Sequence, residues 1–122
     1  MIKGLIHIGF EVEDIQPAID FYEQFGFGLK KKFDKQEPQA KVAHIVNSGG
    51  EVFELWQFID KDHPHVKFIR KHTAFESSNI EEDVQNLLNQ GCELVIPITK
   101  GVTLMYAFVK DKSGNIIEIG QR

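Results

Sequence analysis

Apolar and polar residues alternate along the segment Leu5–Val12. A period of two places successive side chains on opposite faces, so this pattern predicts a strand with one face against a core. The pattern then changes to apolar residues at helical spacing: Ile15, Ala18, Ile19 and Tyr22. We expect a helix here, with Asp14 as its N-terminal cap and Gly26 as the left-handed residue that ends it.

Three strand-like runs follow this helix: Phe27–Phe33, Lys41–Val46 and Glu51–Phe58. The sequence Asn47-Ser48-Gly49-Gly50 between the last two runs is typical of a hairpin turn. The first half of the chain therefore predicts the element order βαβββ.

The second half predicts the same order of elements. We expect a strand at His72–Glu76 and then a helix, in which Asn79 and Glu82 form a capping box and Gly91 ends the helix. Three strands should follow: Glu93–Ile96, Thr103–Val109 and Asn115–Gly120. The last two are joined by a second turn, Asp111-Lys112-Ser113-Gly114.

Two sequence matches indicate that the halves are copies. His7-Ile8-Gly9-Phe10-Glu11 matches His72-Thr73-Ala74-Phe75-Glu76 at an offset of 65 residues, and Val52-Phe53-Glu54-Leu55 matches Ile116-Ile117-Glu118-Ile119 at 64. We predict an α+β protein with a single domain over residues 1–122, built from βαβββ modules at about 1–60 and about 70–122. A lone four-stranded module leaves a sheet edge and a face open, so the copies should pair with each other or with a second chain, as a homodimer.

Composition excludes several classes of protein. The chain has 122 residues, a formal net charge of -4 and one cysteine. No apolar run approaches the roughly 20 residues that cross a bilayer, and no signal-peptide pattern is present, so we expect no membrane association. The single cysteine favours a reducing, cytoplasmic location, and the mild acidity argues against nucleic acid as a partner.

Two histidines and two glutamates fall at matched positions of the repeat: His7 with His72, and Glu54 with Glu118. Both glutamates lie among apolar residues in their strands, where a carboxylate is expensive to bury unless something pairs with it. Neutral imidazole and carboxylate are common ligands of divalent transition metals. The residues alone leave two hypotheses open, a hydrogen-bonded His–Glu pair in each module or a metal site made from all four side chains.

A set of segments, taken in order, carries a resemblance over nearly the whole chain. They are His7-Ile8-Gly9-Phe10, Ala18-Ile19-Asp20-Phe21-Tyr22, Phe25-Gly26-Phe27, Phe53-Glu54-Leu55, His72-Thr73-Ala74-Phe75, and Ala107–Asp111 with Ser113–Glu118. In this order the chain resembles the vicinal oxygen chelate superfamily, which contains glyoxalase I, bleomycin- and fosfomycin-resistance proteins, methylmalonyl-CoA epimerase and extradiol dioxygenases. The resemblance implies the glyoxalase/bleomycin-resistance/dioxygenase fold, in which paired βαβββ modules form a curved mixed sheet around a metal.

The resemblance also implies roles for the four matched residues. In glyoxalase-like members, the positions of His7, Glu54, His72 and Glu118 hold a divalent transition metal such as Zn, Ni, Co, Mn or Fe. The metal acts as a Lewis acid on a carbonyl of a small-molecule substrate. Glu118 would be the base that takes the proton from the neighbouring carbon, detaching from the metal as substrate binds, with Glu54 as its symmetry partner. The implied function is a glyoxalase I-like lyase or isomerase.

Two other functions within the superfamily are alternatives. One is a non-catalytic drug- or metabolite-binding protein of the bleomycin-resistance type, although such proteins generally lack the four ligands. The other is an Fe(II) extradiol dioxygenase, whose metal site has two histidines and one carboxylate instead of four such ligands.

Other members differ from this chain at single positions. Fosfomycin-resistance enzymes carry His at the Glu54 position, and methylmalonyl-CoA epimerase typically carries Gln there. Glutathione-using glyoxalases commonly have Arg at the Glu11 position and Asn at the Phe58 position, so we expect a substrate other than a glutathione adduct.

Aromatic side chains are candidates for an apolar substrate pocket, although each suits core packing equally well: Phe33, Trp56, Phe58 and Tyr106. His44 either faces this pocket or lies on an edge strand. His63 and His65 flank Pro64 in a segment that we expect to be a solvated loop rather than a second metal site.

Overall fold

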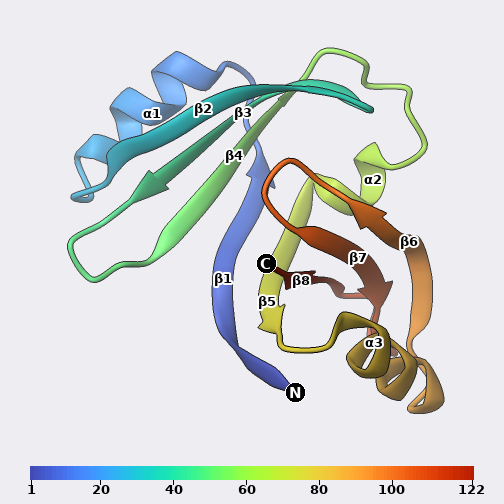
Figure 1. Ribbon diagram of the computed structural model, residues 1–122. Helices are drawn as coiled ribbons and strands as arrows, with labels where there is room; N and C mark the ends of the chain where they lie inside the picture. Colours follow the sequence, from blue (N-terminus) through green and yellow to red (C-terminus); the bar gives the residue numbers. More distant parts are fainter. The chain divides into compact units, whose positions relative to one another are not determined.

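The computed structural model describes residues 1–122, and its elements follow one order twice (Figure 1). The first copy contains β1 (Ile2–Glu11), α1 (Ile15–Glu23), β2 (Gly28–Gln36), β3 (Gln39–Val46) and β4 (Val52–Phe58). A short helix, α2 (Val66–Ile69), precedes the second copy. That copy contains β5 (Lys71–Ser77), α3 (Ile80–Asn89), β6 (Glu93–Lys100), β7 (Met105–Lys110) and β8 (Ile116–Gln121). The predicted order of elements is confirmed, and only α2 was not predicted.

The strands pair in the same way in both copies. β1 is parallel to β4 and β5 is parallel to β8, whereas β2–β3, β3–β4, β6–β7 and β7–β8 are antiparallel. Gly9 lies opposite Glu54 in the first copy, and Ala74 lies opposite Glu118 in the second. These are matched positions, so the repeat extends to the register of the strands. The strand order is β2-β3-β4-β1-β5-β8-β7-β6, a mixed sheet as predicted.

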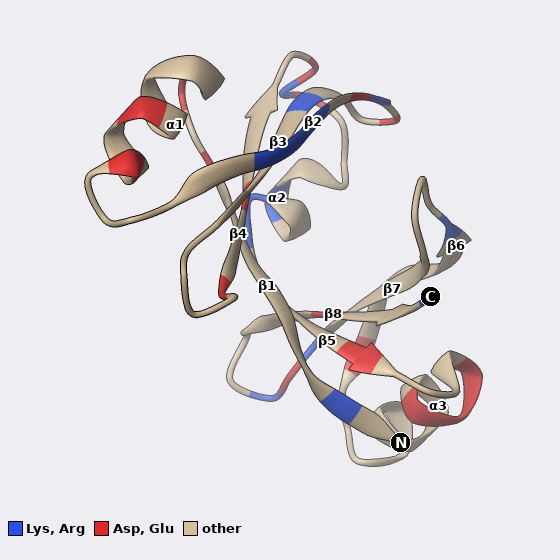
Figure 2. Ribbon diagram, turned by 60° about the vertical axis from the view of Figure 1, so that its left-hand side comes forward, with Lys and Arg blue, Asp and Glu red and all other residues tan.

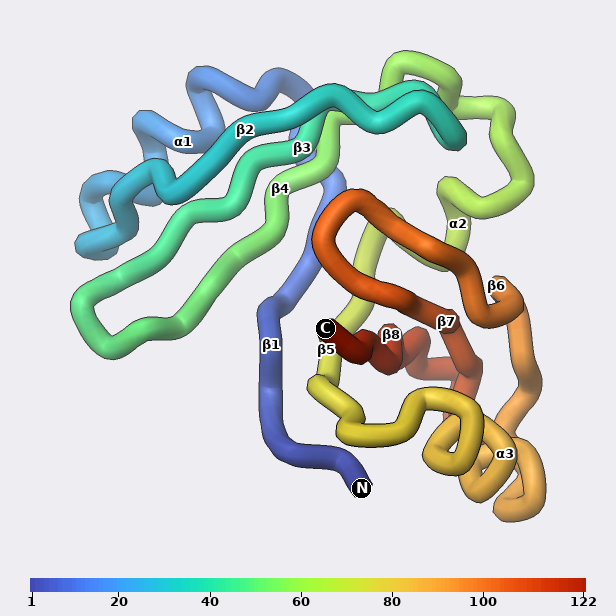
Figure 3. The backbone as a smooth tube through the Cα atoms, in the orientation of Figure 1, coloured from blue at the N-terminus to red at the C-terminus, as the bar shows by residue number.

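The chain forms two compact units, one of residues His7–Lys71 and one of Met1–Ile6 with His72–Arg122. The division therefore falls inside β1. The N-terminus lies beside the turn that leads into α3 (Figure 3), where the carbonyl of Met1 accepts a hydrogen bond from the Ser78 N–H at 3.0 Å. The organisation of both modules as a single domain stays a prediction.

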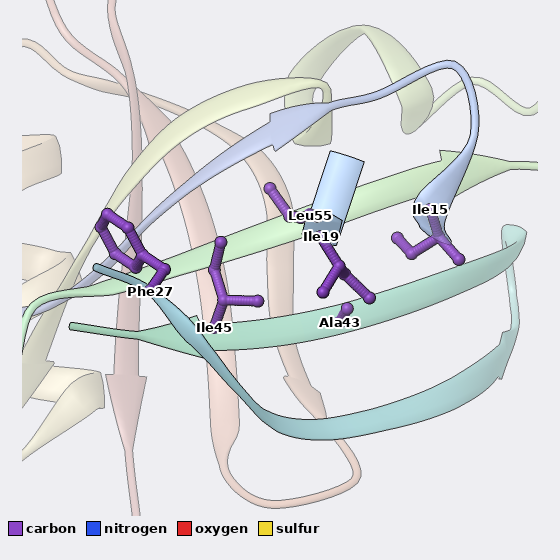
Figure 4. Packing of buried hydrophobic residues seen from close by; sticks show 6 residues of the cluster. All are labelled: Ile15, Ile19, Phe27, Ala43, Ile45 and Leu55. Atoms are coloured by element: carbon purple, nitrogen blue, oxygen red, sulfur yellow. The ribbon is translucent and has the colours of Figure 1, made fainter. Parts of the chain in front are cut away.

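A helix covers one face of the strands in each unit. Figure 4 shows the apolar side chains between α1 and its strands: Ile15, Ile19, Phe27, Ala43, Ile45 and Leu55. The matching cluster in the other unit is Ile80, Val84, Ala107 and Ile119. Burying a large aliphatic side chain contributes about 1.5–3 kcal/mol, so this packing fixes which strand face each helix covers. The strand residues between the packed ones face the opposite way.

Both long helices begin at a glutamine from the last strand of their unit. The Ile15 N–H donates to the side-chain oxygen of Gln57 at 2.9 Å, and the Ile80 N–H donates to that of Gln121 at 2.7 Å. Gln57 and Gln121 are matched residues of β4 and β8. The predicted side-chain cap from Asp14 is wrong, because Asp14 occupies the N-cap position without a side-chain capping bond and Gln57 serves the first N–H of α1 instead.

Asn79 caps α3 as predicted, by accepting a hydrogen bond from the Glu82 N–H at 3.2 Å. The reciprocal half of the predicted capping box is wrong, because the Asn79 N–H donates to the Ser77 hydroxyl at 2.9 Å instead of to Glu82. Acidic residues gather on the first turn of α3 (Figure 2), where the positive end of the helix dipole favours them. Gly26 and Gly91 follow the two helices at φ 84° and 100°, the left-handed region that favours glycine. No helix has the length and apolar content needed to span a membrane.

Candidate functional site

The strand face opposite α1 carries one predicted His–Glu pair. Phe53 and Leu55 pack towards α1, so Glu54 between them points to the other side of β4. Gly9 is the cross-strand partner of Glu54, and His7 stands two residues before Gly9 on the same face of β1. Both His7 and Glu54 are buried, and the imidazole Nε2 lies 3.2 Å from the carboxylate Oε1.

Two further side chains of this unit bind the carboxylate of Glu54. His44 lies directly opposite Glu54 in the antiparallel β3–β4 pair, with its Nε2 2.7 Å from Oε2. Trp56, two residues along β4, donates its indole N–H to Oε1 at 2.7 Å. These hydrogen bonds offset the loss of water around a buried carboxylate. The edge-strand alternative for His44 is wrong, because β3 lies between β2 and β4.

The second unit contains the matching pair on its own helix-free face. His72 and Glu118 are both buried, with Nε2 3.2 Å from Oε1, the same distance as in the first pair. A small residue, Ala74, stands opposite Glu118 as Gly9 stands opposite Glu54. The structure therefore contains both of the His–Glu pairs that the repeat predicted, one within each unit.

The two copies differ in the side chains around the glutamates. Phe108 lies opposite Glu118, at the position that His44 has in the first copy. Gly120 occupies the position of Trp56, two residues after the glutamate. The ring of Phe108 packs edge-on against His72, with centroids 5.0 Å apart. Sequence reasoning missed the contacts of His44 and Trp56 with the carboxylate, because the repeat does not preserve them.

The aromatic residues predicted to line a pocket lie on the same faces as the pairs. Trp56 stacks on Phe58 with centroids 5.4 Å apart, and Phe33 meets His44 edge-on at 5.7 Å. In the other unit, Tyr106 meets Phe108 edge-on at 5.9 Å. Their contact with a substrate stays a prediction.

Matched glutamates further along the same strand faces hold arginines. Glu11 pairs with Arg70 at 3.4 Å, and Glu76 pairs with Arg122 at 3.1 Å. Both arginines are about half exposed, so these ion pairs add little to stability. The carboxylates of Glu11 and Glu76 are therefore each already paired with an arginine of the same chain.

The chemistry of the donors fits a divalent transition metal. Each pair offers one imidazole nitrogen and one carboxylate oxygen, both buried. Zn, Ni, Co, Mn and Fe all accept this combination of ligands. The donor set does not distinguish among these metals, because their preferences for nitrogen and oxygen overlap.

Comparison with known proteins gives a family and a fold. A family model described as Glyoxalase/Bleomycin resistance protein/Dioxygenase superfamily matches residues 4–119. Methylmalonyl-CoA epimerase from Mycobacterium tuberculosis is similar in structure, at TM-score 0.84 and 23% identity, over 98% of this chain and 88% of that chain. A hypothetical protein from Bacillus halodurans C-125 has TM-score 0.81 and 21% identity, over 97% and 93% of the two chains.

A third similar structure contains a ligand. It is a variant of methylmalonyl-CoA epimerase from Streptomyces coelicolor in complex with 2-nitronate-propionyl-CoA, at TM-score 0.81 and 18% identity, over 99% of this chain and 98% of that chain. No curated protein matches the sequence. At these identities the similar structures establish the fold.

Proposed function

Because the chain belongs to the glyoxalase/bleomycin resistance protein/dioxygenase superfamily, we propose that it is a metal-dependent isomerase or lyase. It would remove a proton from the carbon next to a substrate carbonyl. The observation that carries this proposal is the buried His–Glu pair at matched positions of both units. Two of the similar structures are epimerases, which are isomerases, and this supports the same class of reaction here.

The proposed ligands of a single divalent cation are His7, Glu54, His72 and Glu118, all of which are buried. A buried carboxylate is costly to keep charged without a positive partner, and a bound cation would provide one. When bound, the ion supplies Lewis acidity that makes the hydrogen beside the substrate carbonyl more acidic.

Glu118 is the proposed base. Its side chain projects from β8 between Phe108 on the neighbouring strand and Gly120 on its own. An ionised carboxylate can accept a proton, and its place on the helix-free face of β8 puts it beside the proposed metal ligand His72. Glu118 would take the proton from one carbon and return it to the adjacent carbon, which gives an isomerised product.

The charges at Glu11 argue against a glutathione adduct as substrate. The Arg expected in glutathione-using relatives is replaced by an acid, and this acid already holds Arg70. An acid cannot take over the pairing of Arg with a substrate carboxylate, since the sign of the interaction is reversed. We propose a small carbonyl compound as substrate, with its apolar part lying against aromatic side chains: Phe33, Trp56, Phe58 and Tyr106.

We also propose that the active protein is a homodimer in the cytoplasm.

The substitution Glu118→Gln tests the assignment of the base. It keeps the size of the side chain but removes the proton acceptor, so we expect proton transfer to fall by about 10²–10⁴-fold while metal still binds more weakly. The measurement is deuterium exchange from D₂O into the C–H beside the carbonyl, followed by NMR. Two kinds of probe compound are used. The first is a hemithioacetal of methylglyoxal, and the second is methylmalonyl-CoA, the ligand of one similar epimerase.

The exposed Glu93 on β6 provides the control, because Glu93→Gln makes the same chemical change away from the pairs. This variant should exchange at the wild-type rate. Wild-type exchange in Glu118→Gln would remove Glu118 as the base. A wild-type protein that binds metal and probe but exchanges no deuterium would support a binding protein of the bleomycin-resistance type.

A further inference from the structure

We propose that His44 and Trp56 are positioning residues that hold Glu54 as a stationary metal ligand. This inference rests on the proposed function, because it concerns one of the proposed metal ligands.

The first step is that both oxygens of Glu54 are engaged within its own unit. His44 Nε2 lies 2.7 Å from Oε2, and the Trp56 indole N–H donates to Oε1 at 2.7 Å. An ionised carboxylate only accepts hydrogen bonds, and an indole N–H only donates. Any swing of the Glu54 side chain away from this position would break two short hydrogen bonds to a charged group.

The second step is that both donors are themselves held in place. Strand register puts His44 directly opposite Glu54, and its ring meets Phe33 edge-on with centroids 5.7 Å apart. Trp56 is buried and stacks on Phe58 at an interplanar angle of 22°. Neither donor can leave the carboxylate without disturbing aromatic packing on the same strand face.

The third step is the contrast with the second copy. Positions 108 and 120 match His44 and Trp56, but they hold Phe108 and Gly120, whose side chains have no hydrogen-bond donor. The contacts of His44 and Trp56 with a carboxylate are therefore specific to the first copy and are not a requirement of the repeated fold.

Groups that hydrogen-bond a metal ligand typically change metal affinity by about 10–100-fold when they are removed. The repeat itself supplies matched variants. His44→Phe gives position 44 the residue found at position 108, and Trp56→Phe removes the N–H but keeps a ring to stack on Phe58. We expect each to weaken Ni²⁺ binding to the metal-free protein by about 10–100-fold in calorimetric titration.

A further variant distinguishes positioning from simple packing. His44→Gln keeps a donor to the carboxylate, so we expect affinity for Ni²⁺ to stay within about threefold of wild type. A packing role alone would make His44→Gln and His44→Phe weaken Ni²⁺ binding equally.

A spectroscopic signal reports the same contact without any assay of activity. Trp56 is the only tryptophan in the chain, so its indole N–H gives one assignable cross-peak in a ¹H–¹⁵N spectrum. We expect this cross-peak to shift when Zn²⁺ is added and to shift in the Glu54→Gln variant. Thermal unfolding identifies any variant that does not fold. The response of the wild-type cross-peak to Zn²⁺ tests the contact between Trp56 and Glu54 even if a variant fails to fold.

The outcomes separate this inference from the proposed function. If the wild-type protein binds metal, but His44→Phe and Trp56→Phe bind it equally well and the indole signal ignores Zn²⁺, the positioning role is overturned and the metal site stands. If the wild-type protein binds no metal, the proposed function is overturned together with this inference.

Discussion

A small residue stands opposite each of the two glutamates, Gly9 opposite Glu54 and Ala74 opposite Glu118. Paired residues of neighbouring strands project on the same face of the sheet, so a large residue in these places would lie next to the carboxylates. The imidazole two residues earlier reaches the carboxylate at 3.2 Å in both units. The geometry of each pair is therefore set by single positions on the parallel strand.

Asp83 on α3 makes the stability of the fold depend on pH. Burial alone would raise the pKa of its carboxyl, but the Ser77 hydroxyl and the N-terminal ammonium 3.0 Å away outweigh burial and hold the pKa below its ordinary value. A carboxyl with a lowered pKa in the folded state stabilises the fold above its ordinary pKa. That contribution is lost as the pH falls through the lowered value.

We therefore expect Asp83→Asn to be less stable than wild type near neutral pH, with a difference that shrinks below about pH 4. Urea unfolding at a series of pH values measures this difference. The exposed Asp34 gives the control, since Asp34→Asn should leave the pH profile as it is. A constant difference between Asp83→Asn and wild type at all pH values would show that the ion pair does not carry the effect.

At the scale of elements, the first N–H of each long helix is served by a glutamine from a distant strand. Removing the acceptor leaves this N–H without its partner, so Gln57→Ala and Gln121→Ala should each lower the free energy of unfolding by about 0.5–2 kcal/mol. Urea denaturation measures the loss. Gln85→Ala on the exposed face of α3 should change stability by less than about 0.5 kcal/mol. Equal effects of all three substitutions would argue against the capping role.

Periodicity predicted the strands and long helices because their apolar faces pack against one another. The strand Glu93–Ile96 was predicted too short, and β6 continues through Pro97 to Lys100. Proline is rare in central strands because it has no N–H to donate to a neighbouring strand. β6 is an edge strand of the sheet, where proline is tolerated. The four-residue α2 was missed because so short a helix has no period, and Gln57 was missed as a cap because it lies 42 residues from Ile15.

The same reasoning explains what could be predicted of the site. The repeat indicated four residues: His7, Glu54, His72 and Glu118. Histidine and glutamate contribute little to an apolar core, so their recurrence at matched positions of buried strands indicates another role. Symmetry could not identify His44, since its matched residue is a phenylalanine. Only the register of β3 against β4 shows which carboxylate it faces.

At the scale of the whole molecule, a repeated module gives two similar but unequal halves. Each matched pair supplies one imidazole and one carboxylate at the same separation, and a single pair is too few ligands for a metal centre. We expect one metal ion for each chain, and a substitution in either pair should reduce its binding.

Anomalous diffraction from crystals grown with Zn²⁺ distinguishes a single shared metal centre from two separate His–Glu pairs. We expect one strong zinc peak per chain, bonded at about 2.0–2.2 Å to the imidazoles of His7 and His72 and to a carboxylate oxygen of Glu54 and of Glu118. A peak held by only one of the two pairs, a peak at His63 and His65 alone, or no peak at all would contradict it.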